Sequence, residues 1–288
     1  MPPKVKKILV SCLRISLAVY LVILIGFFIF QKKLIFKPTP LPASTQLTPA
    51  IPGSRELSLK TASGGNLSAV FTPAPATVGK SRRLIMHCHG NAGNILGRLG
   101  LIENYHRHNC ASLVVDWCGY GKSSGSPNED EIYANAELCF SWLKEQGWKE
   151  DEIIIHGTSL GGGPATWLAK QHPGCAGLIL SCTFTGIADM ARDRYPFIPP
   201  FVCTTHFDNL GRIAEIKMPL LIVHGTQDSI VRYQHSERLY AAAVSPRKKL
   251  ILVPDTGHNE LDDSKEFWQE FTSFVARVES SIARVREK

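Results

Sequence analysis

The amino-acid sequence predicts an α/β fold, in which a mostly parallel sheet of eight strands carries helices on both faces. From residue 53 onward, short and continuously apolar runs alternate with longer runs of helical periodicity. Such alternation is typical of buried parallel strands joined by crossover helices. A glycine-flanked serine stands between one such strand and the helix after it, and an apolar segment precedes the whole domain.

The predicted strands and helices follow one another along the chain. The strands are expected at 55–59, 67–72, 84–87, 111–115, 153–155, 176–180, 220–223 and 250–253, and the helices at 95–108, 129–146, 160–171, 234–243 and 262–284. A turn at Ser63–Asn66 joins the first two strands and predicts an antiparallel edge. Residues 183–217 break the alternation, contain the aromatic run Tyr195–Phe201, and predict a short lid-like insertion between two core strands.

Composition narrows the class of protein. The chain has 288 residues, of which 44% are hydrophobic and 20% charged, as in an ordinary globular domain. Its net charge is +7, but the basic residues are scattered, so we expect no nucleic-acid partner. The eight cysteines include no C-x-x-C pair and are expected as free, mostly buried thiols, which favours a reducing compartment.

The N-terminal segment is predicted to anchor the chain in a membrane. Residues 8–30 are largely apolar and long enough to cross a bilayer. The basic run Lys4–Lys7 also suits a cleaved signal peptide, but no small-x-small cleavage site follows the apolar run at Phe27–Lys32. We therefore expect an uncleaved, single-pass signal-anchor. Basic residues flank both ends of the segment, so the positive-inside rule does not choose a side of the membrane.

These features divide the chain into three parts. Residues 1–36 are predicted as the membrane anchor, and residues 37–52, rich in proline, threonine and alanine, as an extended linker. Residues 53–288 are predicted as the catalytic domain, with the lid-like insertion at 183–217.

A candidate nucleophile follows the predicted strand 153–155. The run Gly157-Thr158-Ser159-Leu160-Gly161 matches G-x-S-x-G, in which a sharp strand-to-helix turn exposes the serine hydroxyl. The glycines leave room for this turn, and the following helix N-terminus favours negative charge beside the serine. The alternative is a plain glycine-rich loop that starts a helix.

A base and an acid follow in the order that this turn requires, which is serine, acid and histidine. Asp228 comes after the strand 220–223, and His258 comes after the strand 250–253. Taken singly, His258 could be a surface histidine and Asp228 a helix N-cap. Asp255, Glu260 and Asp262 are less suitable acids, because they lie too near His258 and follow no strand of their own.

An oxyanion hole needs two backbone N–H donors. We expect the first from Leu160 and the second from Asn91, with Ala92 as the alternative, in the loop after the strand 84–87. His87 and His89 suggest a metal pair, but no further ligands accompany them, so no metal and no cofactor are predicted.

Four motifs carry a resemblance to a known family: His89-Gly90-Asn91-Ala92, Asp116 to Ser123, Gly157 to Gly162 and His224 to Asp228. With them the chain resembles the single-pass α/β-hydrolase-domain proteins, which are similar to serine aminopeptidase-like hydrolases and include lysophospholipases and protein depalmitoylases. The resemblance implies the α/β-hydrolase fold and a triad of Ser159, Asp228 and His258. Trp117-Cys118 and Arg232 depart from the family's usual Tyr-Arg and Pro, which leaves the substrate open.

The leading interpretation is a membrane-bound serine hydrolase that cleaves esters or thioesters of lipid or acylated substrates. The apolar side chains of the insertion and the nearby anchor favour an acyl chain, although the same aromatics could simply pack the insertion onto the domain. A serine peptidase is the alternative enzyme. A non-catalytic membrane scaffold is the third possibility, and the complete triad argues against it.

Overall fold

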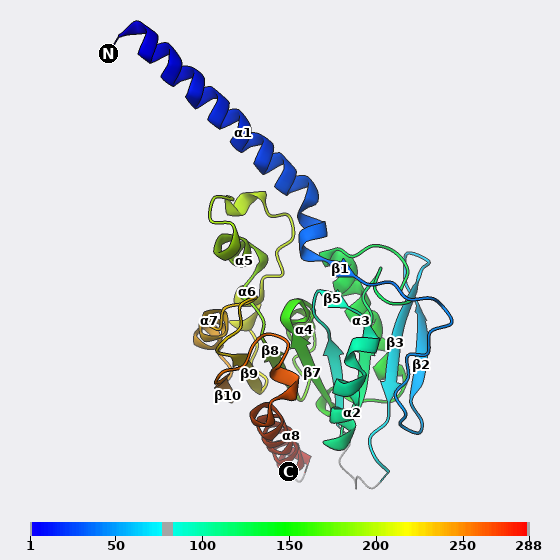
Figure 1. The fold of residues 1–288 in the computed structure, drawn as a ribbon. Coiled ribbons are helices and arrows are strands. Elements are labelled where there is room, and N and C mark those ends of the chain that lie inside the picture. Colours follow the sequence, from blue (N-terminus) through cyan, green and yellow to red (C-terminus); the bar gives the residue numbers. More distant parts are fainter. Residues whose placement is uncertain (1, 77–82, 287–288) are drawn as a thin grey trace.

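The central sheet has eight strands in the order β10-β9-β8-β7-β4-β6-β3-β2 (Figure 1). The fold is that of a computed structural model, which describes residues 2–76 and 83–286. The strands are β2 Arg55–Lys60, β3 Asn66–Thr72, β4 Leu84–Cys88, β6 Ala111–Val115, β7 Ile153–Thr158, β8 Gly177–Ser181, β9 Leu220–Gly225 and β10 Lys248–Val253. Neighbouring strands from β10 to β6 are parallel, whereas β3 pairs antiparallel with both β6 and β2. The predicted fold class and its antiparallel edge are confirmed.

Helices cover both faces of this sheet. Successive residues of each strand point to opposite sides, and the apolar side chains on each side are buried under helices. Met86 and Ile155 pack in one buried cluster with α3 Glu129–Glu145, α4 Gly162–Gln171 and α7 Gln234–Ala242. Ile85 and Ile154 pack in another with α2 Leu99–Arg107 and α8 Lys265–Arg286. The long C-terminal helix starts later than the sequence predicts, because a 3-10 turn at Leu261–Asp263 precedes it.

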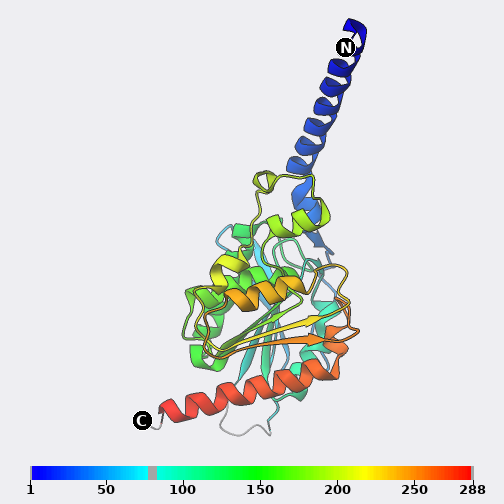
Figure 2. The ribbon, with the colours of Figure 1, turned by 90° about the vertical axis from the view of Figure 1, so that its left-hand side faces the viewer.

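The insertion predicted between two core strands lies between β8 and β9. It contains α5 Ile187–Arg194, a 3-10 turn at Pro200–Val202 and α6 Asn209–Ile213. Figures 1 and 2 both show part of it beside the lower end of the N-terminal helix.

The N-terminal helix α1 runs from Pro3 to Ile35 and projects from the domain (Figure 2). It is the one helix within the described residues that is long and apolar enough to cross a membrane. Most of its large side chains are exposed in the isolated chain.

The stretch 37–52, for which composition predicts an extended linker, lies against the domain. Lys37–Pro38 form a short strand, β1, which pairs with β5 at Ala92–Gly93, and Pro40 bridges to Gly121. Leu47 is fully buried in a small cluster that includes Val70 from β3. The stretch is held against the domain by backbone hydrogen bonds to β5 and by the burial of Leu47.

Replacing Leu47 tests this packing. Leu47→Ala should lower the free energy of unfolding by about 2 to 5 kcal/mol, since a fully buried leucine loses its contacts and leaves a cavity. Gln46→Ala, at an exposed neighbouring position, should change it by no more than about 0.5 kcal/mol. Urea unfolding of the full chain in detergent measures both, and equal midpoints for the two variants would show a free linker.

Candidate active site

Ser159 stands in a strained turn at the end of β7. Its φ angle is +54°, in the left-handed region that non-glycine residues rarely adopt. A single 3-10 turn, Ser159–Gly161, leads directly into α4. The hydroxyl therefore lies between a strand end and a helix N-terminus, as the G-x-S-x-G motif predicts.

The glycines on either side allow the turn to pack closely. A Cβ atom on Gly161 would lie 1.8 Å from the carbonyl oxygen of Cys88, at the end of β4. A Cβ on Gly157 would lie 2.5 Å from the carbonyl oxygen of Gly161. Any larger residue would push the turn, and Ser159 with it, away from the neighbouring strand.

The structure brings Ser159, His258 and Asp228 together in a chain of hydrogen bonds. His258 Nδ1 lies 2.6 Å from Asp228 Oδ2, and His258 Nε2 lies 3.0 Å from Ser159 Oγ. Because a carboxylate only accepts, Nδ1 carries the proton, and Nε2 is left to accept the proton of the serine. The arrangement has the geometry of a nucleophile, a general base and an orienting acid.

The Asp228 carboxylate is buried and receives four hydrogen bonds. Its Oδ1 accepts from the backbone N–H groups of Ile230 and Val231, both at 2.8 Å. Its Oδ2 accepts from His258 and also from His224 Nε2 at 3.0 Å. Burial opposes ionisation, but the hydrogen bonds from His224 and His258 outweigh it, and the pKa of Asp228 falls well below its usual value. The acid is therefore ionised wherever the histidine works as a base.

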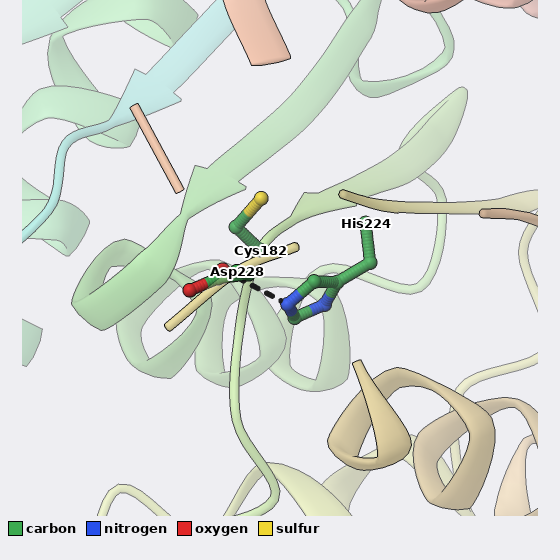
Figure 3. A group of neighbouring side chains, drawn as sticks. All are labelled: Cys182, His224 and Asp228. Atoms are coloured by element: carbon green, nitrogen blue, oxygen red, sulfur yellow. Dashed lines mark hydrogen bonds and ion pairs between the residues drawn. The ribbon is translucent and has the colours of Figure 1, made fainter. Parts of the chain in front are cut away.

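His224, near the end of β9, is a residue whose role sequence reasoning missed. Figure 3 shows it beside Asp228 and Cys182. Its Nδ1 lies 2.6 Å from Ser236 Oγ on α7, which fixes the ring while Nε2 points to Asp228. The motif His224 to Asp228 puts three residues between the two, but that spacing alone does not reveal that a loop folds one side chain onto the other.

Cys182, His224 and Asp228 form a group that could hold a metal ion, since their donor atoms lie within 4.8 Å of one another. The donors do not fit such a role well. A metal on Asp228 Oδ2 would displace the bonds from His258 and His224. Burial also raises the pKa of the Cys182 thiol far above its usual value, which favours the protonated form that ligates metals poorly.

The predicted oxyanion donors, Asn91 and Leu160, line one pocket together with Ser159. The loop that carries Asn91 passes close to the nucleophile, because a Cβ on Gly90 would lie 3.3 Å from Ser159 Cβ. Asn91 is held firmly: its carbonyl accepts from Lys37 N and Tyr120 Oη, both at 2.9 Å, and its side-chain amide donates to Ile35 O at 3.0 Å.

The histidines near this loop have separate partners. His87 Nδ1 bonds to Tyr105 Oη at 3.0 Å on the α2 side of the sheet. His89 Nδ1 bonds to the carbonyl of Gly90 at 2.7 Å, and its Nε2 lies 3.5 Å from Asp116. His89 therefore supports the loop, whereas His87 packs on the far side of the sheet. Asp116 accepts from Ile95 N in the same loop region and is not part of the hydrogen-bond chain of Ser159.

Ser159 lies at a pocket of about 370 Å³. Apolar side chains from the insertion line it, among them Phe184, Ile187 and Met190. Residues of α1 line it as well, among them Phe27 and Leu34. Sequence reasoning assigned α1 to the membrane alone and missed this contribution.

Comparisons with known proteins show the family to which this fold belongs. The uncharacterized protein Rv2307c of Mycobacterium tuberculosis is 34% identical over 234 residues, which cover 80% of this chain and 81% of that protein. A family model described as the α/β hydrolase fold matches residues 83–200, and one described as serine aminopeptidase S33 matches residues 208–265. The chain belongs to the α/β-hydrolase family. The predicted family resemblance is thereby confirmed, and a hydrolase is supported.

Other proteins are similar to this chain at lower identity. Human alpha/beta hydrolase domain-containing protein 17B is 27% identical over 224 residues, which cover 76% of this chain and 74% of that protein. The esterase Pf2001 of Pyrococcus furiosus has a similar fold, with a TM-score of 0.67 at 18% identity over 84% of this chain and 98% of its own. A monoacylglycerol lipase of Paleococcus ferrophilus has a TM-score of 0.57 at 20% identity over 74% of this chain and 98% of its own.

Two glycine variants test the packing of the turn. Gly161→Ala should destabilise the hydrolase by about 3 kcal/mol or more and displace Ser159, because the new Cβ meets backbone of β4. Gly100→Ala places a methyl group on α2 where no atom lies within 4 Å, and should stabilise by up to about 1 kcal/mol. Thermal unfolding compares the two, and a fully stable Gly161→Ala variant would contradict the close approach.

Proposed function

We propose that this protein is a membrane-anchored serine hydrolase that cleaves ester or thioester bonds of lipid or acylated substrates. The observation that carries the proposal is the hydrogen-bond chain from Ser159 through His258 to Asp228, which lies at a pocket with an apolar wall. The helix α1 supports membrane attachment by its length and hydropathy.

The reaction runs in two halves. Ser159 Oγ attacks the acyl carbon while His258 Nε2 takes its proton, and the backbone N–H groups of Asn91 and Leu160 stabilise the oxyanion. His258 then gives the proton to the departing alcohol or thiol, which leaves an acyl group on Ser159. A water molecule, deprotonated by His258, attacks this ester; His258 returns the proton to Ser159 Oγ as the acid leaves. Asp228 orients His258 and stabilises its charged form throughout.

The apolar pocket wall favours substrates with an acyl chain. Phe184, Ile187 and Met190 offer contact to the methylene groups of such a chain, while polar residues such as Asp193 and Arg232 in the same lining can bind a polar leaving group. Among proteins of similar fold are the monoacylglycerol lipase of Paleococcus ferrophilus and a monoglyceride lipase of Saccharomyces cerevisiae.

A serine peptidase is the second candidate. The match to the serine aminopeptidase model covers residues 208–265, which include both Asp228 and His258. Both reactions use the same triad, so the two candidates differ in the leaving group that the pocket accepts. Aminoacyl anilides and acyl esters, offered to the same preparation, distinguish them.

Two aspartate variants test the assignment of the acid. Asp228→Asn should lower kcat by roughly a thousandfold or more, since the imidazole loses the acceptor that orients it. Asp255→Asn should change kcat by less than about twofold, because Asp255 is exposed and bonds to Gln227, and asparagine tolerates its positive φ angle. Steady-state hydrolysis of an activated ester measures both. The assignment is wrong if Asp228→Asn is nearly silent while Asp116→Asn abolishes turnover.

A series of acyl esters tests the substrate class. With the full chain in phospholipid nanodiscs, kcat/KM should rise by about tenfold or more from acetyl to octanoyl and longer esters, because each buried methylene adds binding energy. If acetyl and butyryl esters are cleaved as well as the longer ones, the acyl-chain proposal fails. A small-ester hydrolase or a peptidase then remains.

A further inference from the structure

Resting on the function proposed above, we propose that the last turns of α1 form a wall of the acyl-binding pocket. The membrane anchor then takes part in substrate selection, and the acyl chain of a bilayer lipid or a lipidated protein reaches Ser159 along the anchor itself.

One face of α1 is turned toward the domain. Its buried and half-buried side chains in this region include Tyr20, Leu24, Phe27, Gln31 and Ile35. These positions are three or four residues apart, so they share one side of the helix. Neighbouring positions such as Phe28 remain exposed, at 56% of the side chain's surface. A helix that served as an anchor alone would have no need of a domain-facing side.

The contacts along this face join α1 to the insertion. Tyr20 Oη donates to the carbonyl of Phe197 at 2.8 Å, and the rings of Phe27 and Tyr195 pack edge to face at 5.7 Å. Figures 1 and 2 both show this part of the insertion beside the helix.

Gln31 is buried between α1 and the insertion and bonds the two together. Only 2% of the residue is exposed. Its Nε2 donates to the carbonyl of Val202 at 3.1 Å, and its Oε1 accepts from Thr204 N at 2.8 Å. A buried amide is costly to leave unpaired, so these bonds hold the insertion against α1.

The pocket extends from the nucleophile to this helix. Ser159 and Leu160 line it together with Phe27 and Leu34 of α1. Tyr195, which packs on Phe27, belongs to the same wall. An acyl chain attached at Ser159 and lying in this pocket therefore contacts side chains of α1.

The position of these contacts along α1 determines how deep they would lie in a membrane. Tyr20 and Phe27 belong to the apolar run 8–30 that is long enough to span a bilayer, and both contact the insertion. The insertion also carries the exposed rings of Phe197 (54%) and Phe201 (84%). Exposed apolar side chains such as phenylalanine can insert at the boundary between headgroups and acyl chains. With α1 in a bilayer, Phe27 lies near the end of the apolar run and Leu34 just beyond it, so the helix wall of the pocket starts at the edge of the lipid and an acyl chain can enter there without crossing bulk water.

Tryptophan variants on two sides of α1 test the inference. Phe27→Trp and Leu34→Trp enlarge side chains that line the pocket, and Phe28→Trp enlarges an exposed neighbour as the matched control. Each full-length variant in phospholipid nanodiscs is offered lauroyl and acetyl p-nitrophenyl esters. The lauroyl-to-acetyl ratio of kcat/KM should fall by about tenfold in the two pocket variants and stay within about twofold in the control. Labelling by a small fluorophosphonate reports whether the serine site is intact.

The outcomes separate this inference from the proposed function. If wild-type turnover persists in Ser159→Ala, the proposed function fails first. If turnover depends on Ser159 but the ratio is unchanged in both pocket variants, α1 is no part of the acyl site and the hydrolase proposal stands. If the tryptophan variants lose labelling, Phe27→Ala decides instead: the larger pocket should raise the palmitoyl-to-lauroyl ratio by about threefold or more, and an unchanged ratio overturns the inference.

Discussion

The close approach of the turn after β7 to the end of β4 is the constraint on which the site depends. Gly161 packs directly against the backbone of Cys88, and this contact allows Ser159 to keep a positive φ angle. With the turn in place, the start of α4 and the loop at Asn91 meet at the serine. The strain at Ser159 is local, and it is offset by a core in which both faces of the sheet are covered.

Asp228 is the second fixed point, because a buried carboxylate is stable only when its oxygens are satisfied. Two backbone N–H groups and two histidines satisfy it. His258 comes from the loop after β10, whereas His224 comes from β9 and is anchored by Ser236 on α7. The carboxylate thus ties neighbouring strand ends together and aims the imidazole at Ser159. The hydrogen bonds that keep Asp228 ionised are thus the same ones that fix the position of His258.

Much of this arrangement could be predicted from the sequence, since strand patterns and motif spacing are local signals. The run Gly157 to Gly161 after a β-branched strand indicates the turn, and residue order indicates Asp228 and His258 as its partners. The packing of α1 was missed because the apolar positions of such a helix look equally fit for lipid. Gln31 stands beside Lys32 and Lys33, so its polarity alone does not distinguish a buried protein contact from a membrane-flanking position. The stretch 37–52 was predicted as a linker from its composition, which does not reveal that Leu47 is buried.

The central claim is that an acyl group is carried on Ser159 during turnover. It is tested most directly by mixing the full-length protein with a slowly deacylated ester, quenching in acid within the first turnover, and measuring the intact mass and the modified peptide. We expect a mass increase of one acyl group, located on Ser159 and absent in Ser159→Ala. Turnover with no covalent adduct, or with the acyl group on another residue, would contradict it.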